Sequence, residues 1–68
     1  MSETSSKNYN YDYDKIKDAR EFAKKTNNEY LEALIDGFLV ENDPEYRYDM
    51  YVAIVEGTKE LKEIYKWN

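Results

Sequence analysis

The fold class of this 68-residue chain depends on whether residues 43–65 form a helix or a strand, and their sequence is D-P-E-Y-R-Y-D-M-Y-V-A-I-V-E-G-T-K-E-L-K-E-I-Y. It opens with three helix-start signals, because Asp43 can cap a helix, Pro44 suits its first position and Glu45 is an acid in its first turn. One stripe then recurs at helical spacing through Arg47, Tyr51, Ile54, Thr58, Leu61 and Tyr65. This unbroken stripe predicts a helix over the whole stretch.

The first half of the same stretch also has the pattern of a strand. Its alternating residues are Tyr46, Tyr48, Met50, Val52 and Ile54, and several of them favour sheets. A strand near 45–55 would need a new register after Gly57, whereas the helical stripe needs none. Gly57 followed by Thr58 could still end one helix and start another, so a break there is an open alternative.

A second helix is predicted just upstream, between residues 26 and 42. Thr26 and Glu29 have the spacing of a capping box at its start, and Asn42 is its expected end. Its apolar face, the richest in the chain, comprises Tyr30, Leu31, Leu34, Ile35, Phe38 and Leu39. Gly37 lies off that face, which indicates either a closely approaching neighbour helix or an unoptimised position.

A first helix is predicted over residues 14–25, with either Asp12 or Asp14 as its cap. Its narrow apolar stripe comprises Ile16, Ala19, Phe22 and Ala23. Tyrosines at 9, 11 and 13 precede it, alternating with Asn and Asp, so they form either a short strand or an arm laid across the helices or a partner. Residues 1–8 are polar without periodicity and are predicted to be a disordered tail.

These elements predict an all-α fold in a single small helical domain spanning residues 9–68. We expect a compact three-helix bundle, or a four-helix bundle if Gly57 breaks the last helix. The alternative is an α+β fold with strands near 9–13 and 45–55.

Composition excludes several classes of site. The chain has no cysteine and no histidine, which removes disulfides, thiolate zinc sites and the usual general base. The only serines, at 2, 5 and 6, lie in the predicted tail, and no phosphate-binding glycine loop is present. We therefore expect a protein that is not an enzyme and has no cofactor. With no secretory signal and no membrane span in the sequence, we expect it to be cytoplasmic.

A calcium loop is a weak alternative near the first helix. Counted from Asn10, four acids fall at loop positions 3, 5, 9 and 12, and they are Asp12, Asp14, Asp18 and Glu21. Lys15 stands where the loop needs glycine, and no helix precedes it. Acids at the positive end of a helix are the plainer explanation.

The negative charge is concentrated in the middle of the chain. Residues 29–56 carry eight acids and one base, Arg47, for a net charge of −7 within a total of −5. This sign argues against direct nucleic-acid binding and favours a protein partner with a basic surface. Tyrosine is also abundant, eight of 68 residues, and it is enriched at protein interfaces.

We therefore expect a small acidic interaction protein that binds another protein, or itself as a homodimer, through a tyrosine-bearing helical surface. The candidate partner-binding residues are Glu29, Glu32, Asp36, Glu41, Asp43, Glu45, Tyr46, Tyr48, Asp49 and Glu56. The alternative is a DNA-mimicking inhibitor of a nucleic-acid enzyme, because acids one helical turn apart are spaced on the scale of strand phosphates. The small size and the Asn, Lys, Ile and Tyr usage resemble those of small phage or mobile-element proteins.

Overall fold

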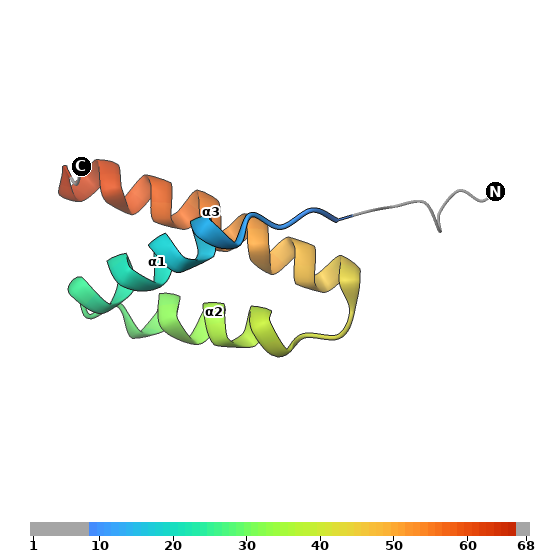
Figure 1. Cartoon of the computed structure of the whole chain (residues 1–68). Coiled ribbons are helices and arrows are strands. Elements are labelled where there is room, and N and C mark those ends of the chain that lie inside the picture. The colour runs from blue at the N-terminus through green and yellow to red at the C-terminus, as the bar shows by residue number, and fades with distance from the viewer. Residues whose placement is uncertain (1–8, 67–68) are drawn as a thin grey trace.

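Three helices run up, down and up in a bundle in which each packs against the other two (Figure 1). The computed structural model describes residues 9–66, and the predicted tail at 1–8 lies outside them. The helices are α1 (Tyr13–Lys25), α2 (Glu29–Val40) and α3 (Pro44–Tyr65). The predicted three-helix fold is confirmed. Residues 9–66 contain no strand, so the α+β alternative with strands near 9–13 and 45–55 is wrong.

Side-chain caps start α1 and α3 where the sequence indicated. Asp12 caps α1, its Oδ1 accepting a hydrogen bond from the backbone N–H of Asp14 at 3.1 Å. Asp43 caps α3 by accepting from the N–H groups of Glu45 at 3.0 Å and Tyr46 at 3.5 Å. Each cap satisfies donors that a helix start leaves without an intrahelical partner.

The predicted capping box at Thr26 is wrong. The Thr26 hydroxyl donates back to the Phe22 carbonyl at 2.8 Å, so Thr26 closes α1 instead of opening α2. Asn27 then adopts a left-handed conformation with φ of 56°, which Asn tolerates better than most residues. Asn28 caps α2 by accepting from the N–H of Leu31 at 3.0 Å. At its other end α2 stops at Val40, two residues before the expected Asn42.

The last helix is continuous through Gly57 for 22 residues, so a fourth helix does not form in the described part of the chain. Ile54 and Thr58 flank Gly57 one turn apart, and both are buried. Packing on both sides of Gly57 thus holds the helix together against the backbone freedom of glycine.

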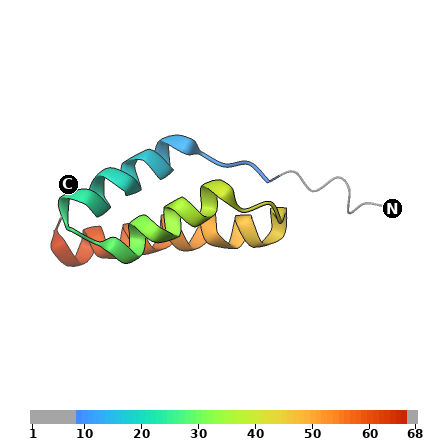
Figure 2. The same ribbon diagram turned by 90° about the horizontal axis from the view of Figure 1, so that it is seen from below.

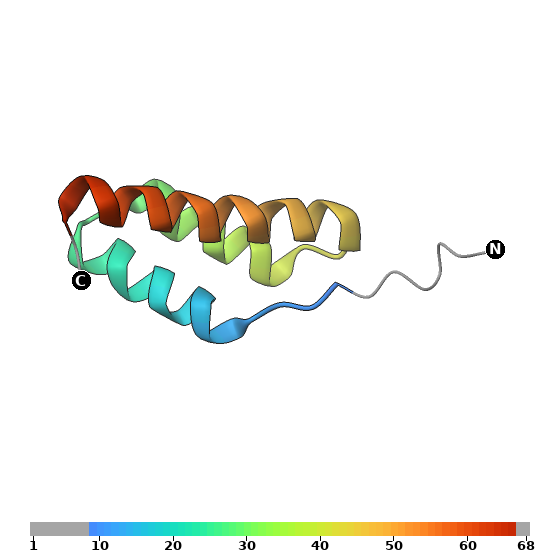
Figure 3. The same cartoon turned by 90° about the horizontal axis from the view of Figure 1, so that it is seen from above.

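The core lies between the three helices and holds the predicted stripe of α1. Its members are Ile16, Ala19, Phe22, Ala23, Leu31, Ile35, Phe38 and Ile54. Figures 2 and 3 show α2 running antiparallel to both α1 and α3. A helix with two neighbours buries one face only, so Tyr30 and Leu39, expected inside, are 77% and 45% exposed. Tyr65, the last residue of the predicted stripe of α3, is 54% exposed.

Candidate functional site

The segment before α1 is an extended arm that lays its tyrosines across α3 and the end of α2. The Tyr11 ring lies 5.2 Å from the rings of both Phe38 and Tyr51, edge to face. Tyr9 stacks on Tyr48 with 4.9 Å between ring centres. The Tyr51 hydroxyl accepts from the backbone N–H of Asp12 at 3.1 Å, which ties the arm to the middle of α3. The arm predicted as one alternative to a strand is therefore what forms.

Arg47 is the polar centre of this aromatic cluster. Its Cζ lies 4.7 Å from the Phe38 ring centre and 5.0 Å from that of Tyr11, within cation–π range. Its Nε donates to the Phe38 carbonyl at 3.0 Å, and its Nη2 donates to the Tyr13 hydroxyl at 3.1 Å. The single base of the acidic block thus joins the arm, α2 and α3.

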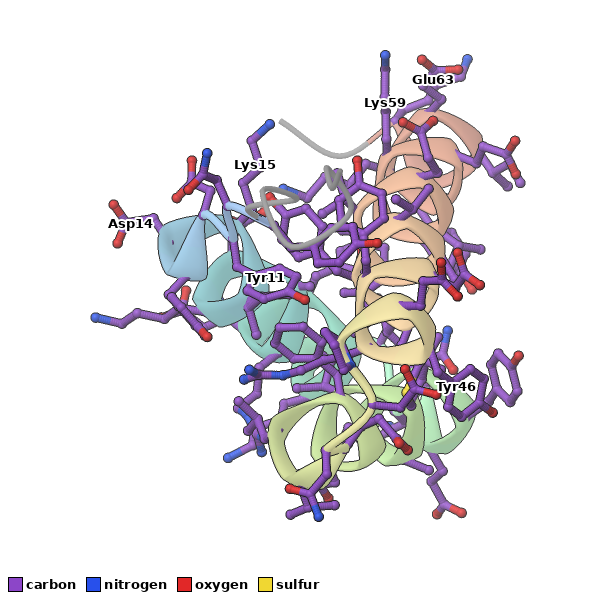
Figure 4. The ribbon with its side chains drawn as sticks, turned by 90° about the vertical axis from the view of Figure 1, so that its right-hand side faces the viewer. Tyr11, Asp14, Lys15, Tyr46, Lys59 and Glu63 are labelled. Atoms are coloured by element: carbon purple, nitrogen blue, oxygen red, sulfur yellow. The ribbon has the colours of Figure 1, made fainter. Side chains whose placement is uncertain are left out.

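Burial raises the pKa of the Tyr11 phenol above its usual value, and the positive charge of Arg47 acts in the opposite direction. The Tyr11 hydroxyl lies 3.4 Å from the Pro44 carbonyl, to which it donates. A phenol that stays neutral and packs between helices (Figure 4) serves the fold. The cluster therefore accounts for much of the tyrosine content without invoking a partner.

The two tyrosines predicted at the working surface differ in their surroundings. Tyr48 is 37% exposed and belongs to the cluster, since it stacks on Tyr9 and lies 6.2 Å from Tyr51. Tyr46 is 56% exposed and projects from the start of α3 on the side away from α1 (Figure 4). Tyr46 is thus the one of the pair whose ring is offered to solvent.

Asp36, Glu41 and Asp43, among the eight predicted acids, have defined roles inside the fold. Asp43 caps α3, and Glu41 accepts from the N–H of Asp43 at 3.1 Å. Asp36 forms an ion pair with Arg20 of α1 at 2.8 Å. The other five acids are exposed or half-buried, and they are Glu29, Glu32, Glu45, Asp49 and Glu56.

The two acidic rows do not share one surface. The Arg20–Asp36 pair places the α2 row, Glu29, Glu32 and Asp36, towards α1. The α3 row, Glu45, Asp49 and Glu56, is exposed and lies on the opposite side of α3 from buried Ile54. The structure therefore separates the residues that the sequence grouped as one acidic block.

The calcium alternative gains no support from the geometry. Asp12 is a helix cap, and Asp18 pairs with Lys62 of α3. Across residues 9–66 no three carboxylates gather where they could hold a metal ion, so Asp14 and Glu21 do not join the other two in a site.

A different surface runs between α2 and α3, and the sequence signal for it was Gly37. A Cβ atom on Gly37 would lie 2.8 Å from Cε of Met50, so the two helices meet there. Because they run antiparallel, Tyr30 stands level with Gly57, and Ala33 with Ala53. We call this the α2–α3 face, and its residues are Tyr30, Ala33, Gly37, Tyr46, Met50, Ala53 and Gly57. Only Tyr46 among them was a predicted site residue.

No protein-family model matches this chain, and no curated protein or solved structure matches it. None of the three helices has the length and hydropathy that crossing a membrane requires.

Proposed function

We propose that this protein is a non-enzymatic binding module that docks a helix of another protein on its α2–α3 face. The observation that carries the proposal is the exposure of two tyrosines on the α2–α3 face: Tyr30 is 77% exposed and Tyr46 is 56% exposed. Tyrosines that the fold does not use elsewhere are suited to anchor a partner, because the ring supplies apolar area and the hydroxyl tolerates water.

The strip between the two tyrosines is made of small residues. Ala33 and Ala53 are exposed on facing helices, and Gly57 has no side chain to fill the space beside Tyr30. Small side chains let a third helix approach closely, since the distance between packed helix axes depends on the residues at the contact. Tyr46 lies eleven residues from Gly57, so the tyrosines are about 16 Å apart, or about three turns of a docked helix.

Acids border the α2–α3 face along its α3 edge and define the chemistry of the partner. Asp49 and Glu56 lie one turn to either side of Ala53 on α3. A partner helix with an apolar face flanked by Lys or Arg complements this arrangement. A second copy of this chain would place the same acidic edges against one another, so a homodimer is the less favourable occupant.

DNA mimicry is the second candidate, and it rests on the exposed row Glu45, Asp49 and Glu56. The proposal for it is weaker because the α2 row lies on another side and Asp36 is already paired. The two candidates differ in salt dependence. Docking through rows of exposed charge weakens steeply as salt rises, whereas docking of tyrosines in an apolar strip persists.

The test is affinity capture from extracts of the source cells with four immobilised forms of the protein. These are the wild type, Tyr30→Lys, Tyr46→Lys and the control Val52→Lys, whose site is exposed on α3 outside the strip. We expect one protein to be retained by the wild type and Val52→Lys at low and high salt, and lost with both tyrosine variants. Retention by all four forms, or loss at high salt alone, would overturn docking on this face, and a concentration-dependent mass in sedimentation would identify the homodimer instead.

A further inference from the structure

A cavity of about 280 Å³ opens between α1 and α3, on a side of the molecule that the α2–α3 face does not include. Its walls are formed by Lys15, Asp18, Val55, Thr58, Lys59 and Lys62. The volume lies near the lower end of the range for small-molecule sites. A cavity of this size suits a small organic molecule rather than a peptide helix.

The cavity is positively charged although the protein is acidic. Three of its lining residues are lysines and one is an acid, Asp18, which pairs with Lys62. The local charge is therefore +2 in a chain with a net charge of −5. Figure 4 shows Lys15 on α1 and Lys59 on α3 pointing to the same side of the molecule. The two lysines thus flank the opening from opposite helices.

Thr58 provides the second observation. Its side chain is 5% exposed, and its Oγ1 is buried with no hydrogen-bond partner among the described residues. A buried hydroxyl left without a partner destabilises the fold, because its lost bonds with water are not replaced. Thr58 is also the most buried residue of the cavity wall, so a bound group that accepts from its hydroxyl would remove that cost.

From these features we propose that the cavity between α1 and α3 binds a small phosphomonoester. The phosphoryl group is a dianion that matches the local charge of +2, and lysine ammonium groups bind phosphate as point charges. The Thr58 hydroxyl donates to one phosphoryl oxygen. Val55 and the methylene stems of the lysines cover the organic part of the ligand. This site is independent of the docking face.

The test is titration of the full chain with phenyl phosphate, followed by calorimetry and by the amide NMR shifts of α1 and α3. Thr58→Val keeps the shape of the side chain and removes the donor, whereas Thr58→Ser keeps the donor. Lys15→Gln removes a charge from the cavity wall, and Lys24→Gln removes one from the last turn of α1, outside it.

We expect saturable binding of phenyl phosphate by the wild type. Thr58→Val should weaken the affinity about tenfold and Lys15→Gln severalfold. Thr58→Ser and Lys24→Gln should keep the affinity within about twofold of the wild type. Benzyl alcohol, which lacks the phosphoryl group, is expected not to bind. Equal binding by Thr58→Val and the wild type would overturn the site. So would equal losses for the two Lys→Gln variants, which would indicate general charge attraction. A melting curve of Thr58→Val at or above that of the wild type separates lost binding from lost folding.

Discussion

The Cε atom of Met50 lies 2.8 Å from the position that a Cβ atom on Gly37 would occupy. The Met50 side chain therefore fills the space left by the missing methyl group and brings α3 close against α2. This contact sits in the middle of the α2–α3 face, between the exposed rings of Tyr30 and Tyr46. The two glycines of the chain therefore differ in the space around them, because nothing lies within 4 Å of the corresponding Cβ position on Gly57.

Gly57→Ala is expected to stabilise the protein by about 1 kcal/mol, the usual gain in helix propensity over glycine. Gly37→Ala gains the same propensity but must move the Met50 methyl, which is half-buried on a flexible side chain. We expect its net gain to be smaller. Urea unfolding of both variants measures the difference, and a larger gain for Gly37→Ala would contradict the close approach of the helices.

Asp43→Ala is expected to destabilise the protein by about 1 kcal/mol, because the first turn of α3 loses the acceptor of two N–H groups. Asn42→Ala is the matched control one residue earlier, where no cap is made. Denaturant midpoints for the two variants check this, and equal midpoints would show that Asp43 does not cap α3.

Arg47→Lys is expected to cost about 1–3 kcal/mol, since one ammonium group cannot reproduce both hydrogen bonds and the contact with two rings. Arg20→Lys is the comparison, because its partner Asp36 is largely exposed and a surface ion pair contributes about 0–1 kcal/mol. The free energies of unfolding of Arg47→Lys and Arg20→Lys, each compared with the wild type, test this difference. Similar costs would mean that Arg47 is only another surface charge.

Stability is expected to fall as the pH rises through the ordinary tyrosine range. Burial raises the pKa of Tyr11 above its usual value of 10.0, so the unfolded chain loses this proton at a lower pH than the folded one. The contribution of Tyr11 is thus fully present below the unfolded pKa and is lost as the pH rises through the folded pKa. Tyr11→Phe should show a shallower fall between neutral and alkaline pH in urea unfolding. An equally steep fall in Tyr11→Phe would assign the effect to other groups.

Periodicity and caps were enough to predict the three helices and most of the core. The caps Asp12 and Asp43 could be predicted because a cap depends only on residues that are close to it in the chain. The prediction for Thr26 was wrong because its hydroxyl can hydrogen-bond at the end of α1 as well as at the start of α2. The left-handed conformation of Asn27 determines that Thr26 ends α1. The stripe of α3 was enough to predict a helix but not the burial of each member, since Ile54 and Thr58 are buried whereas Tyr65 is 54% exposed.

The candidate site was harder to predict for a related reason. Asp36 and Glu29 share a row in sequence, but the ion pair with Arg20 turns that row towards α1. Tyr48 and Tyr46 are two residues apart, yet the ring of Tyr9 stacks on Tyr48 whereas Tyr46 is 56% exposed. Whether a side chain is exposed or paired depends on contacts between segments far apart in the chain. The spacing of residues along a single helix carries no information about these contacts.

Site-specific photo-crosslinking tests the proposed docking face most directly. Benzoylphenylalanine is introduced at position 46, on the strip, or at position 52, which is exposed on another side of α3. Both proteins are irradiated in the source cells. We expect a discrete adduct with another protein from position 46 only, and this adduct should disappear when Tyr30→Lys is added. An adduct from position 52 alone, or an adduct from position 46 that survives Tyr30→Lys, would contradict docking on this face.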